Sequence, residues 1–203
     1  MSHGVLPKEV AEGMRVGMAP LARRLHAIGV TPNVVTFTGF ALSVAGSVLL
    51  AMDRPLAAFI LILVGTLSDT LDGTLARAGG GGTKLGAFLD STVDRLSDSA
   101  VAAGTIGLGV AASDALLLWA GVIGLISSSL VPYVRAKAES LGLTANIGLA
   151  PREARLTVFL IGLGVWAILG YPLAFTAAVV AVAVLSTITF LQRIAAVAAA
   201  LRA

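Results

Sequence analysis

Long apolar stretches alternate with short polar breaks from residue 33 almost to the end of the chain. Each stretch is about as long as the roughly 20 apolar residues that cross a bilayer as one helix. The six predicted segments cover residues 33–52, 56–78, 84–111, 115–136, 153–169 and 172–194. Turn-forming residues such as Asp53-Arg54-Pro55 separate them. The pattern predicts an all-α polytopic membrane protein with six transmembrane helices.

The first 30 residues follow a different pattern. Between residues 7 and 29, apolar residues recur at helical spacing, and basic residues lie between them. Such an interfacial amphipathic helix suits a membrane surface with anionic headgroups, although a solvated helix remains the alternative. We expect Pro20 to kink or split it. The predicted organisation is a juxtamembrane helix over residues 1–30 and a six-helix membrane domain over residues 31–203.

The composition fits a chain that mostly avoids water. Hydrophobic residues fill 57% of the 203 positions and charged residues 12%, which is about half the charged share of a soluble domain. The chain has no cysteine, so disulfides and thiol-based catalysis are excluded from it. The N-terminus lacks the pattern of a signal peptide, and none is expected.

The basic residues predict the orientation of the helices. An even number of spans places both termini on one side of the membrane, together with the loops near residues 78–85 and 135–155. Every lysine and arginine except Arg54 lies in these regions or in the adjoining halves of the spans. Basic residues concentrate on the cytoplasmic side of membrane proteins, so both termini are expected in the cytoplasm.

Aspartates gather in one part of the chain, inside or beside apolar segments. Five of the seven lie between residues 69 and 98, where ionised side chains are costly and normally mark function. Asp69 and Asp72 share one helical face, and Asp90, Asp94 and Asp98 share a face of the next helix. A short glycine loop joins the two helices, so we expect them to be antiparallel neighbours whose acidic faces meet.

Carboxylates packed together repel one another and lose hydration, so either protons or cations must compensate them. Oxygen ligands select hard ions such as Mg²⁺ or Mn²⁺, and a pair of such ions suits displacement at phosphorus. Gly73 and Gly86 permit close approach beside the aspartates, and Arg77 lies one turn after Gly73, where it can clamp a phosphate. A cation or proton transporter, or a salt-bridge network with Arg77 and Arg95, remains the alternative.

The stretch from Asp69 to Asp94 resembles the signature of the CDP-alcohol phosphotransferase family, D-x-x-D-G-x-x-A-R-x8-G-x-x-x-D-x-x-x-D. All the fixed positions match, namely Asp69, Asp72, Gly73, Ala76, Arg77, Gly86, Asp90 and Asp94. Members of this family are membrane enzymes that move a phosphatidyl group from a CDP-activated lipid to an alcohol. The resemblance implies the same reaction class for this chain and leaves little room for a transporter.

The resemblance also implies roles for individual residues. Two Mg²⁺ ions, or Mn²⁺, would be held in each active site by Asp69, Asp72, Asp90 and Asp94. Asp94 would in addition act as the general base on the acceptor hydroxyl. Asp98 lies outside the signature, and we expect it to pair with a buried donor or to order the site rather than to bind metal. CDP-diacylglycerol would contact Thr31, Pro32, Asn33, Val34, Gly73, Arg77, Thr83 and Gly86. Without the family, Thr31-Pro32-Asn33 would be an ordinary helix start.

Outside the signature, the chain is most similar to bacterial members that use inositol 1-phosphate as the acceptor. Residues 133–139, 151–156 and 192–193 carry this similarity. The acceptor phosphate would be bound by Lys137, Arg155 and Arg193, with Arg152 in reserve. Cytoplasmic lysines and arginines are also explained by membrane orientation alone. Glycerol 3-phosphate would need the same cations, so a phosphatidylglycerophosphate synthase remains the alternative within the family.

The expected reaction therefore transfers the phosphatidyl group of CDP-diacylglycerol to inositol 1-phosphate, giving phosphatidylinositol phosphate and CMP. The enzyme is expected in the bacterial inner or plasma membrane as a multi-pass protein, with its active site on the cytoplasmic side. Its partners would be the lipid bilayer and, because family members are commonly homodimers, a second copy of the chain. No nucleic acid is expected among them.

Overall fold

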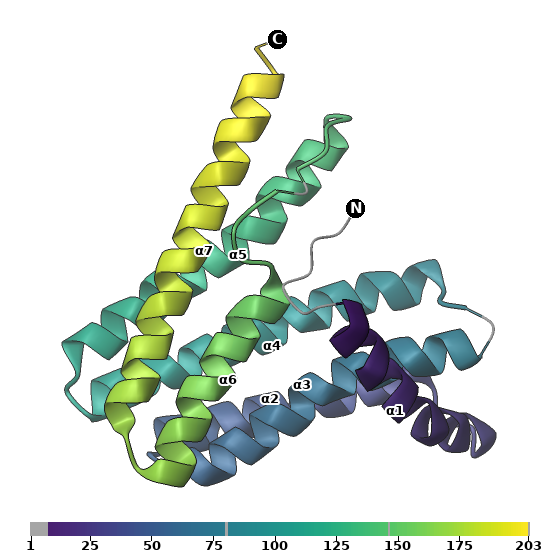
Figure 1. Ribbon diagram of the computed structural model, residues 1–203, viewed down its shortest axis with the longest axis horizontal. Helices are drawn as coiled ribbons and strands as arrows, with labels where there is room; N and C mark the ends of the chain where they lie inside the picture. The colour runs from purple at the N-terminus through teal and green to yellow at the C-terminus, as the bar shows by residue number, and fades with distance from the viewer. Residues whose placement is uncertain (1–7, 80, 146, 203) are drawn as a thin grey trace. The chain divides into compact units, whose positions relative to one another are not determined.

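The computed structural model describes residues 8–79, 81–145 and 147–202, and every regular element within them is an α-helix. Residues 1–7 of the predicted N-terminal segment lie outside the described residues. The helices (Figure 1) are α1 Lys8–Ala27, α2 Pro32–Ala51, α3 Pro55–Ala78, α4 Lys84–Ala111, α5 Ala115–Ser140, α6 Arg152–Leu169 and α7 Pro172–Ala200. The predicted all-α fold class is confirmed.

Helices α2 to α7 coincide with the six predicted apolar segments. The bounds agree to within one residue except at the C-terminal ends of α5 and α7, which lie four and six residues further along. Helix α1 confirms the N-terminal helix, and it is not split at Pro20, which lies inside it. The alternative, a kink at Pro20, stays a prediction. Its predicted place on the membrane surface stays a prediction.

Four helices have the length and apolar composition to cross a membrane, namely Pro32–Ala51, Pro55–Ala78, Ala115–Ser140 and Pro172–Ala200. Helices α4 and α6 differ because charged residues are built into them. No stretch of 18 residues in either helix contains fewer than three charged side chains. The chain is therefore an all-helical protein with four candidate membrane spans, and the count of six remains a prediction.

The chain divides within α4 into two compact units. Of the described residues, 8–79 and 81–104 form the N-terminal unit, and 105–145 and 147–202 form the C-terminal unit. The acidic cluster predicted from the sequence belongs to the N-terminal unit, and the cations predicted to bind the acceptor belong to the C-terminal unit.

Small residues form the contact between α2 and α3 in the N-terminal unit. A β-carbon added to Gly46 of α2 would lie 2.7 Å from Cγ1 of Ile62 in α3. Gly104 of α4 comes similarly close to the backbone carbonyl of Ser47 in α2. Such interfaces are typical of membrane bundles, because bulky apolar residues gain little by leaving lipid for a neighbouring helix.

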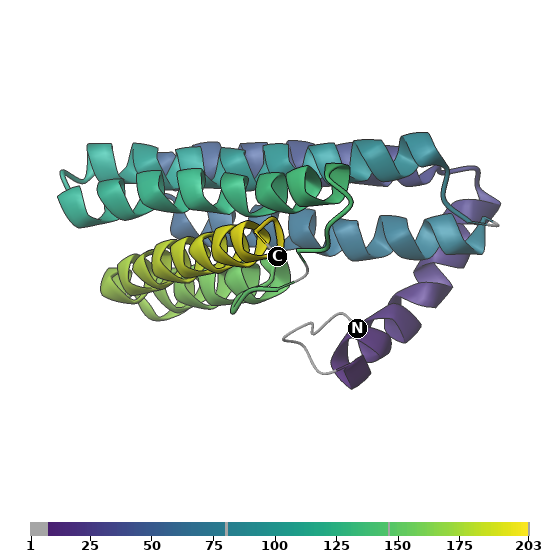
Figure 2. The same cartoon turned by 90° about the horizontal axis from the view of Figure 1, so that it is seen from above.

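Helix α1 packs against α3 and runs at an angle to it (Figure 2). Ala22 of α1, Val35 of α2 and Leu75 of α3 form a buried apolar cluster. At the end of α3, the ring of His26 lies so close to Gly79 that an added β-carbon there would be 3.3 Å from its Cε1 atom. Helix α1 is thus fixed at the end of α3 from which the glycine loop leads to α4.

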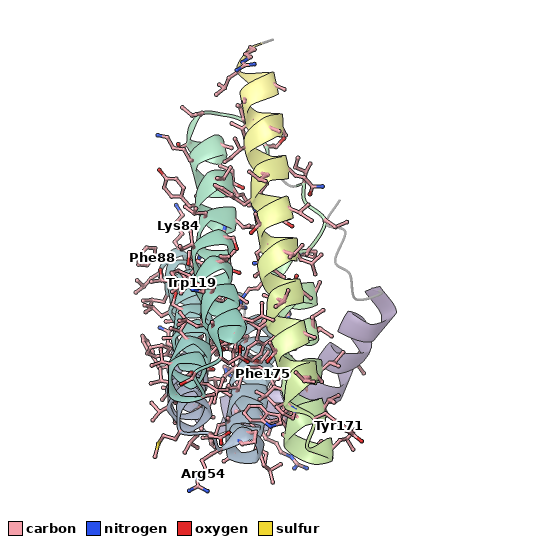
Figure 3. All side chains as sticks on the ribbon, turned by 90° about the vertical axis from the view of Figure 1, so that its left-hand side faces the viewer. Arg54, Lys84, Phe88, Trp119, Tyr171 and Phe175 are labelled. Carbon is pink, nitrogen blue, oxygen red and sulfur yellow. The ribbon has the colours of Figure 1, made fainter. Side chains whose placement is uncertain are left out.

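In the C-terminal unit, α7 packs against both α5 and α6. Phe175 of α7 is labelled in Figure 3. Its ring meets that of Phe159 edge-on at 5.4 Å and stacks on Trp166 at 5.5 Å. The hydroxyl groups of Ser128 in α5 and Ser186 in α7 form a hydrogen bond of 2.9 Å. Aromatic contacts therefore join α7 to α6, and a partly buried pair of hydroxyl groups joins it to α5.

Large apolar side chains lie on the outside of the helices in both units. Phe88 of α4 is 63% exposed and Trp119 of α5 is 61% exposed (Figure 3). The buried positions of α2, by contrast, are mostly small or hydroxylated, namely Val35, Thr36, Gly39, Ser43, Gly46, Ser47 and Leu50. This distribution is the reverse of that in a water-soluble helix bundle and suits a lipid environment.

Candidate functional site

The predicted acidic residues lie on α3 and α4, on either side of the glycine loop. Asp69 and Asp72 are one turn apart on α3, and Asp72 is almost fully buried, with 4% of its surface exposed. Both Asp69 and Asp90, the latter on α4, lie within electrostatic range of Asp72. Asp94 follows Asp90 one turn later on α4 and is partly buried. The structure thus brings three of the four predicted ligands into one region.

The donor chemistry of this region suits a hard divalent cation. All the candidate ligands are carboxylate oxygens, and their mutual repulsion in a partly dehydrated site favours cation binding. Among the described residues, however, no three acidic or histidine side chains already form a metal-binding group. Asp90 is exposed. The residue types fit a metal, although the described side chains do not form a closed coordination set.

Thr36 of α2 holds the buried carboxylate. Its hydroxyl donates to Oδ2 of Asp72 at 2.6 Å, and the same hydroxyl oxygen lies 3.1 Å from the carbonyl oxygen of Pro32. Thr36 and Asp72 are 6% and 4% exposed, so the hydrogen bond is shielded from solvent. The bond links the first turns of α2 to the acidic face of α3.

Arg77 folds back over Gly73, as expected for residues one turn apart. A β-carbon added to Gly73 would lie 3.9 Å from both Nη1 and Nη2 of Arg77. The guanidinium donates to the hydroxyl of Thr74 at 3.3 Å, and the Arg77 side chain is otherwise exposed. The absence of a side chain at Gly73 therefore leaves space beside a guanidinium group that can face a phosphate.

The start of α2 lies beside the start of α4. Oδ1 of Asn33 is 4.0 Å from the position that a β-carbon on Gly86 would occupy, so these two predicted contacts are neighbours. Thr83 caps α4, because its hydroxyl accepts a hydrogen bond of 2.9 Å from the backbone N–H of Gly86. Thr31 and Val34 are exposed at the same end of α2. These residues of α2 and α4 line one end of the N-terminal unit.

The cations predicted to bind the acceptor lie on three helices of the C-terminal unit. Arg193 is seven residues before the end of α7, and the others lie in the last turn of α5 or the first turn of α6. Lys137 is exposed in the last turn of α5, and Arg152 is the first residue of α6. Arg155 is 6% exposed, and its Nη1 donates to the carbonyl oxygen of Ala150 at 2.9 Å. Of these four cations, Lys137 is exposed, Arg152 and Arg193 are partly buried, and Arg155 is buried.

Arg193 of α7 connects two other segments through backbone carbonyl groups. Its Nε donates to the carbonyl oxygen of Ile147 at 2.8 Å, and its Nη1 donates to that of Val131 in α5 at 2.9 Å. Arginine has five N–H donors, so these bonds do not by themselves prevent it from binding an anion. They do give Arg193 a structural role that the sequence did not indicate.

The loop before α6 has further anchors on α7. The side-chain carbonyl of Gln192 accepts from the backbone N–H of Leu149 at 2.9 Å, and the hydroxyl of Thr189 accepts from that of Ala150 at 3.1 Å. A β-carbon added to Gly148, whose φ is +135°, would lie 2.5 Å from the methyl group of Thr189. Sequence reasoning missed these anchors because nothing in the spacing of the residues pairs α7 with this loop.

The chain has relatives among known proteins. Residues 29–200 match the family described as CDP-alcohol phosphatidyltransferase. The phosphatidylinositol phosphate synthase of Mycobacterium marinum is 40% identical over 179 residues, which cover 86% of this chain and 76% of that protein.

Two crystal structures of the Mycobacterium tuberculosis phosphatidylinositol phosphate synthase, which is 39% identical, have a similar fold. The structure with CDP-DAG bound has a TM-score of 0.81 and covers 89% of this chain and 92% of the other. The complex with manganese and citrate has a TM-score of 0.82 and covers 89% and 88%. At this identity and coverage, the likeness extends over most of both chains.

Proposed function

Because this chain belongs to the CDP-alcohol phosphatidyltransferase family, we propose that it transfers a phosphatidyl group from CDP-diacylglycerol to inositol 1-phosphate. The products are phosphatidylinositol phosphate and CMP. The observation that carries the choice of acceptor is the 40% identity to a phosphatidylinositol phosphate synthase over 86% of the chain. The solved relative with CDP-DAG bound supports the choice of donor.

The donor site in this proposal is formed by the ends of α2, α3 and α4 in the N-terminal unit. Its residues are Thr31, Pro32, Asn33, Val34, Gly73, Arg77, Thr83 and Gly86. Two contacts support it, since the Asn33 side chain lies beside Gly86 and the Arg77 guanidinium lies beside Gly73. A glycine at each position leaves room for the nucleotide and its phosphates.

The four aspartates are the proposed metal ligands. Two Mg²⁺ ions, or Mn²⁺, held by Asp69, Asp72, Asp90 and Asp94 would offset the charge of the diphosphate and activate the attacking and leaving oxygens. The grouping of three of these carboxylates in one region supports the assignment. The manganese complex of the related synthase supports it as well.

Asp94 is the proposed general base, which removes the proton from the acceptor hydroxyl. The resulting oxygen attacks the phosphorus that carries diacylglycerol, the bond to the CMP oxygen breaks, and Arg77 stabilises the charge of the departing CMP. The acceptor phosphate is bound by Lys137, Arg155 and Arg193, with Arg152 in reserve. The closeness of Lys137 and Arg152 to helix ends supports their accessibility to a soluble acceptor.

The proposed setting is a bacterial membrane, with six spans, α1 on the surface and the site on the cytoplasmic side. Apolar exteriors on the helices of both units support a lipid environment. Arg54, the one basic residue expected outside the cytoplasm, is exposed at the turn between α2 and α3 (Figure 3). A homodimer is part of the proposal by analogy with the family.

Reconstitution of the full chain in nanodiscs tests the reaction. With CDP-diacylglycerol and Mg²⁺ present, we expect CMP release when inositol 1-phosphate is added and little release with glycerol 3-phosphate or without an acceptor. CMP release with glycerol 3-phosphate alone would make the chain a phosphatidylglycerophosphate synthase. Absence of CMP with both acceptors, together with ion flux in liposomes, would favour a transporter and overturn the proposal.

A further inference from the structure

Thr36 differs from Thr38, which lies on the same helix, in the partner of its hydroxyl group. Thr38 on the same helix donates to the carbonyl of Val34, four residues earlier, at 2.8 Å, which is an ordinary helical bond. Thr36 also lies within reach of the carbonyl four residues before it, at 3.1 Å. Its shorter bond, 2.6 Å, reaches the carboxylate of Asp72 on another helix. A hydroxyl has one hydrogen, so distance and charge both favour the carboxylate.

The contact is not needed to join the two helices. Helix α2 already packs against α3 through small residues, with the position of a Gly46 β-carbon 2.7 Å from Ile62. The Thr36 hydroxyl instead fixes one oxygen of a carboxylate that is 4% exposed and lies within electrostatic range of Asp69 and Asp90. Side chains that bind metals are commonly oriented by such outer hydrogen bonds.

We propose that Thr36 is a positioning residue, whose hydroxyl orients the Asp72 carboxylate for binding a divalent cation. This inference rests on the proposed function, in which Asp72 is a metal ligand. The inference adds a residue from outside the signature, which runs from Asp69 to Asp94. Thr36 lies on α2, one turn after Pro32, and Pro32 belongs to the segment proposed to contact the nucleotide. The first turns of α2 would thus contact the lipid donor and also orient Asp72, a proposed ligand of the metal.

Metal binding by matched variants tests the proposal. Binding of Mn²⁺ alone to the full chain in nanodiscs is measured by electron paramagnetic resonance for wild type, Thr36→Val, Thr36→Ser and Thr38→Val. We expect Thr36→Val to weaken Mn²⁺ binding about 10–100-fold, the range seen when outer partners of metal ligands are removed. Thr36→Ser keeps the hydroxyl and should bind like wild type. Thr38→Val loses a hydroxyl on the same helix and should also bind like wild type.

Two further measurements separate positioning from folding. CMP release at increasing Mn²⁺ should show that Thr36→Val needs more metal but recovers most of its rate at saturation. In an Asp72→Asn background, Thr36→Val should cause no further loss of Mn²⁺ affinity, because the two residues act through one ligand. If Thr36→Val folds poorly, Thr36→Ala, which removes the same hydroxyl with less bulk, provides the same comparison.

The outcomes distinguish the inference from the proposed function. Equal Mn²⁺ affinity in wild type and Thr36→Val, with wild type active, overturns the role of Thr36 and leaves the reaction intact. An additive loss in the Asp72→Asn background likewise overturns it. A wild-type chain that neither binds Mn²⁺ nor releases CMP overturns the proposed function and, with it, the inference.

Discussion

Charged residues of the two units differ in their hydrogen-bond partners. In the N-terminal unit, Asp72 is buried with other carboxylates near it, and a threonine hydroxyl is the described side chain that donates to it. In the C-terminal unit, Arg155 and Arg193 donate to backbone carbonyls at 2.8–2.9 Å. The two arginines therefore hold backbone segments in place, whereas the Thr36 hydroxyl fixes the orientation of a buried carboxylate. The contacts of Arg155 and Arg193 thus explain part of their presence by structure alone.

Loss of the proposed general base should have the largest effect. Asp94→Asn removes a proton acceptor with little change of volume, so we expect turnover to fall on the order of 10²–10⁴-fold. CMP release at saturating substrates and metal measures the change, and a thermal melt of the same sample checks folding. A folded variant within tenfold of the wild-type rate would remove Asp94 from this role.

One pair of variants in the C-terminal unit distinguishes a role in binding the acceptor from a role in stability. Lys137 is exposed, so Lys137→Gln should raise the KM for inositol 1-phosphate with little change in melting temperature. Arg193→Gln should lower stability by about 1–3 kcal/mol, because the Ile147 and Val131 carbonyls lose charged donors. Thermal melts and acceptor titrations measure both effects. An unchanged melting temperature in Arg193→Gln would show that its backbone contacts contribute little.

Glycine-to-alanine substitutions compare helix packing in the two units. Gly46→Ala places a methyl group 2.7 Å from Ile62 and should destabilise the N-terminal unit by about 1–3 kcal/mol. Gly124→Ala is the control in the C-terminal unit, since its nearest neighbour, Ala183, lies at 3.9 Å, an ordinary contact distance. Melting in detergent ranks the two variants. Equal tolerance of both would mean that α2 and α3 separate easily.

The smallest expected effect concerns the cap of α4. Thr83→Ala should cost about 1 kcal/mol through loss of the hydrogen bond to Gly86, and Thr83→Asn should restore most of it. A nucleotide contact predicts something else, namely a raised KM for CDP-diacylglycerol in Thr83→Ala. Melting and donor titrations distinguish these roles. If the KM for CDP-diacylglycerol rises and the melting temperature is unchanged, Thr83 acts by contacting the ligand, and its cap contributes little to stability.

The sequence predicted the helices well because their apolar periods are local. The predicted ends of α5 and α7 were wrong because the apolar pattern stops before each helix does. Lys137 and Glu139 continue α5 beyond the predicted end at residue 136, since charged residues with good helix propensity extend a helix into a polar region. Pro20 did not split α1, and Ala22, two residues later, is buried against α3, so tertiary packing helps to retain the helix.

The acidic residues were found from their spacing, whereas their partners were not. The bond between Thr36 and Asp72 spans 36 residues and depends on how α2 and α3 are aligned, which no periodicity specifies. The anchors of Gln192 and Thr189 on the loop before α6 are equally remote in sequence. Thr83 as a cap could have been recognised, because threonine directly before a helix is a common N-cap.

The placement of bulky side chains outside and glycine or serine inside has a practical consequence. Association of α2 with α3 depends on shape and not on exclusion of water, so the two surfaces of each helix can be altered independently. Outward positions such as Phe37, Val48 and Ile60 can be redesigned for aqueous solution while Gly39, Ser43 and Gly46 are kept. A water-soluble version of the N-terminal unit can therefore be designed by replacing its outward-facing apolar residues with polar ones.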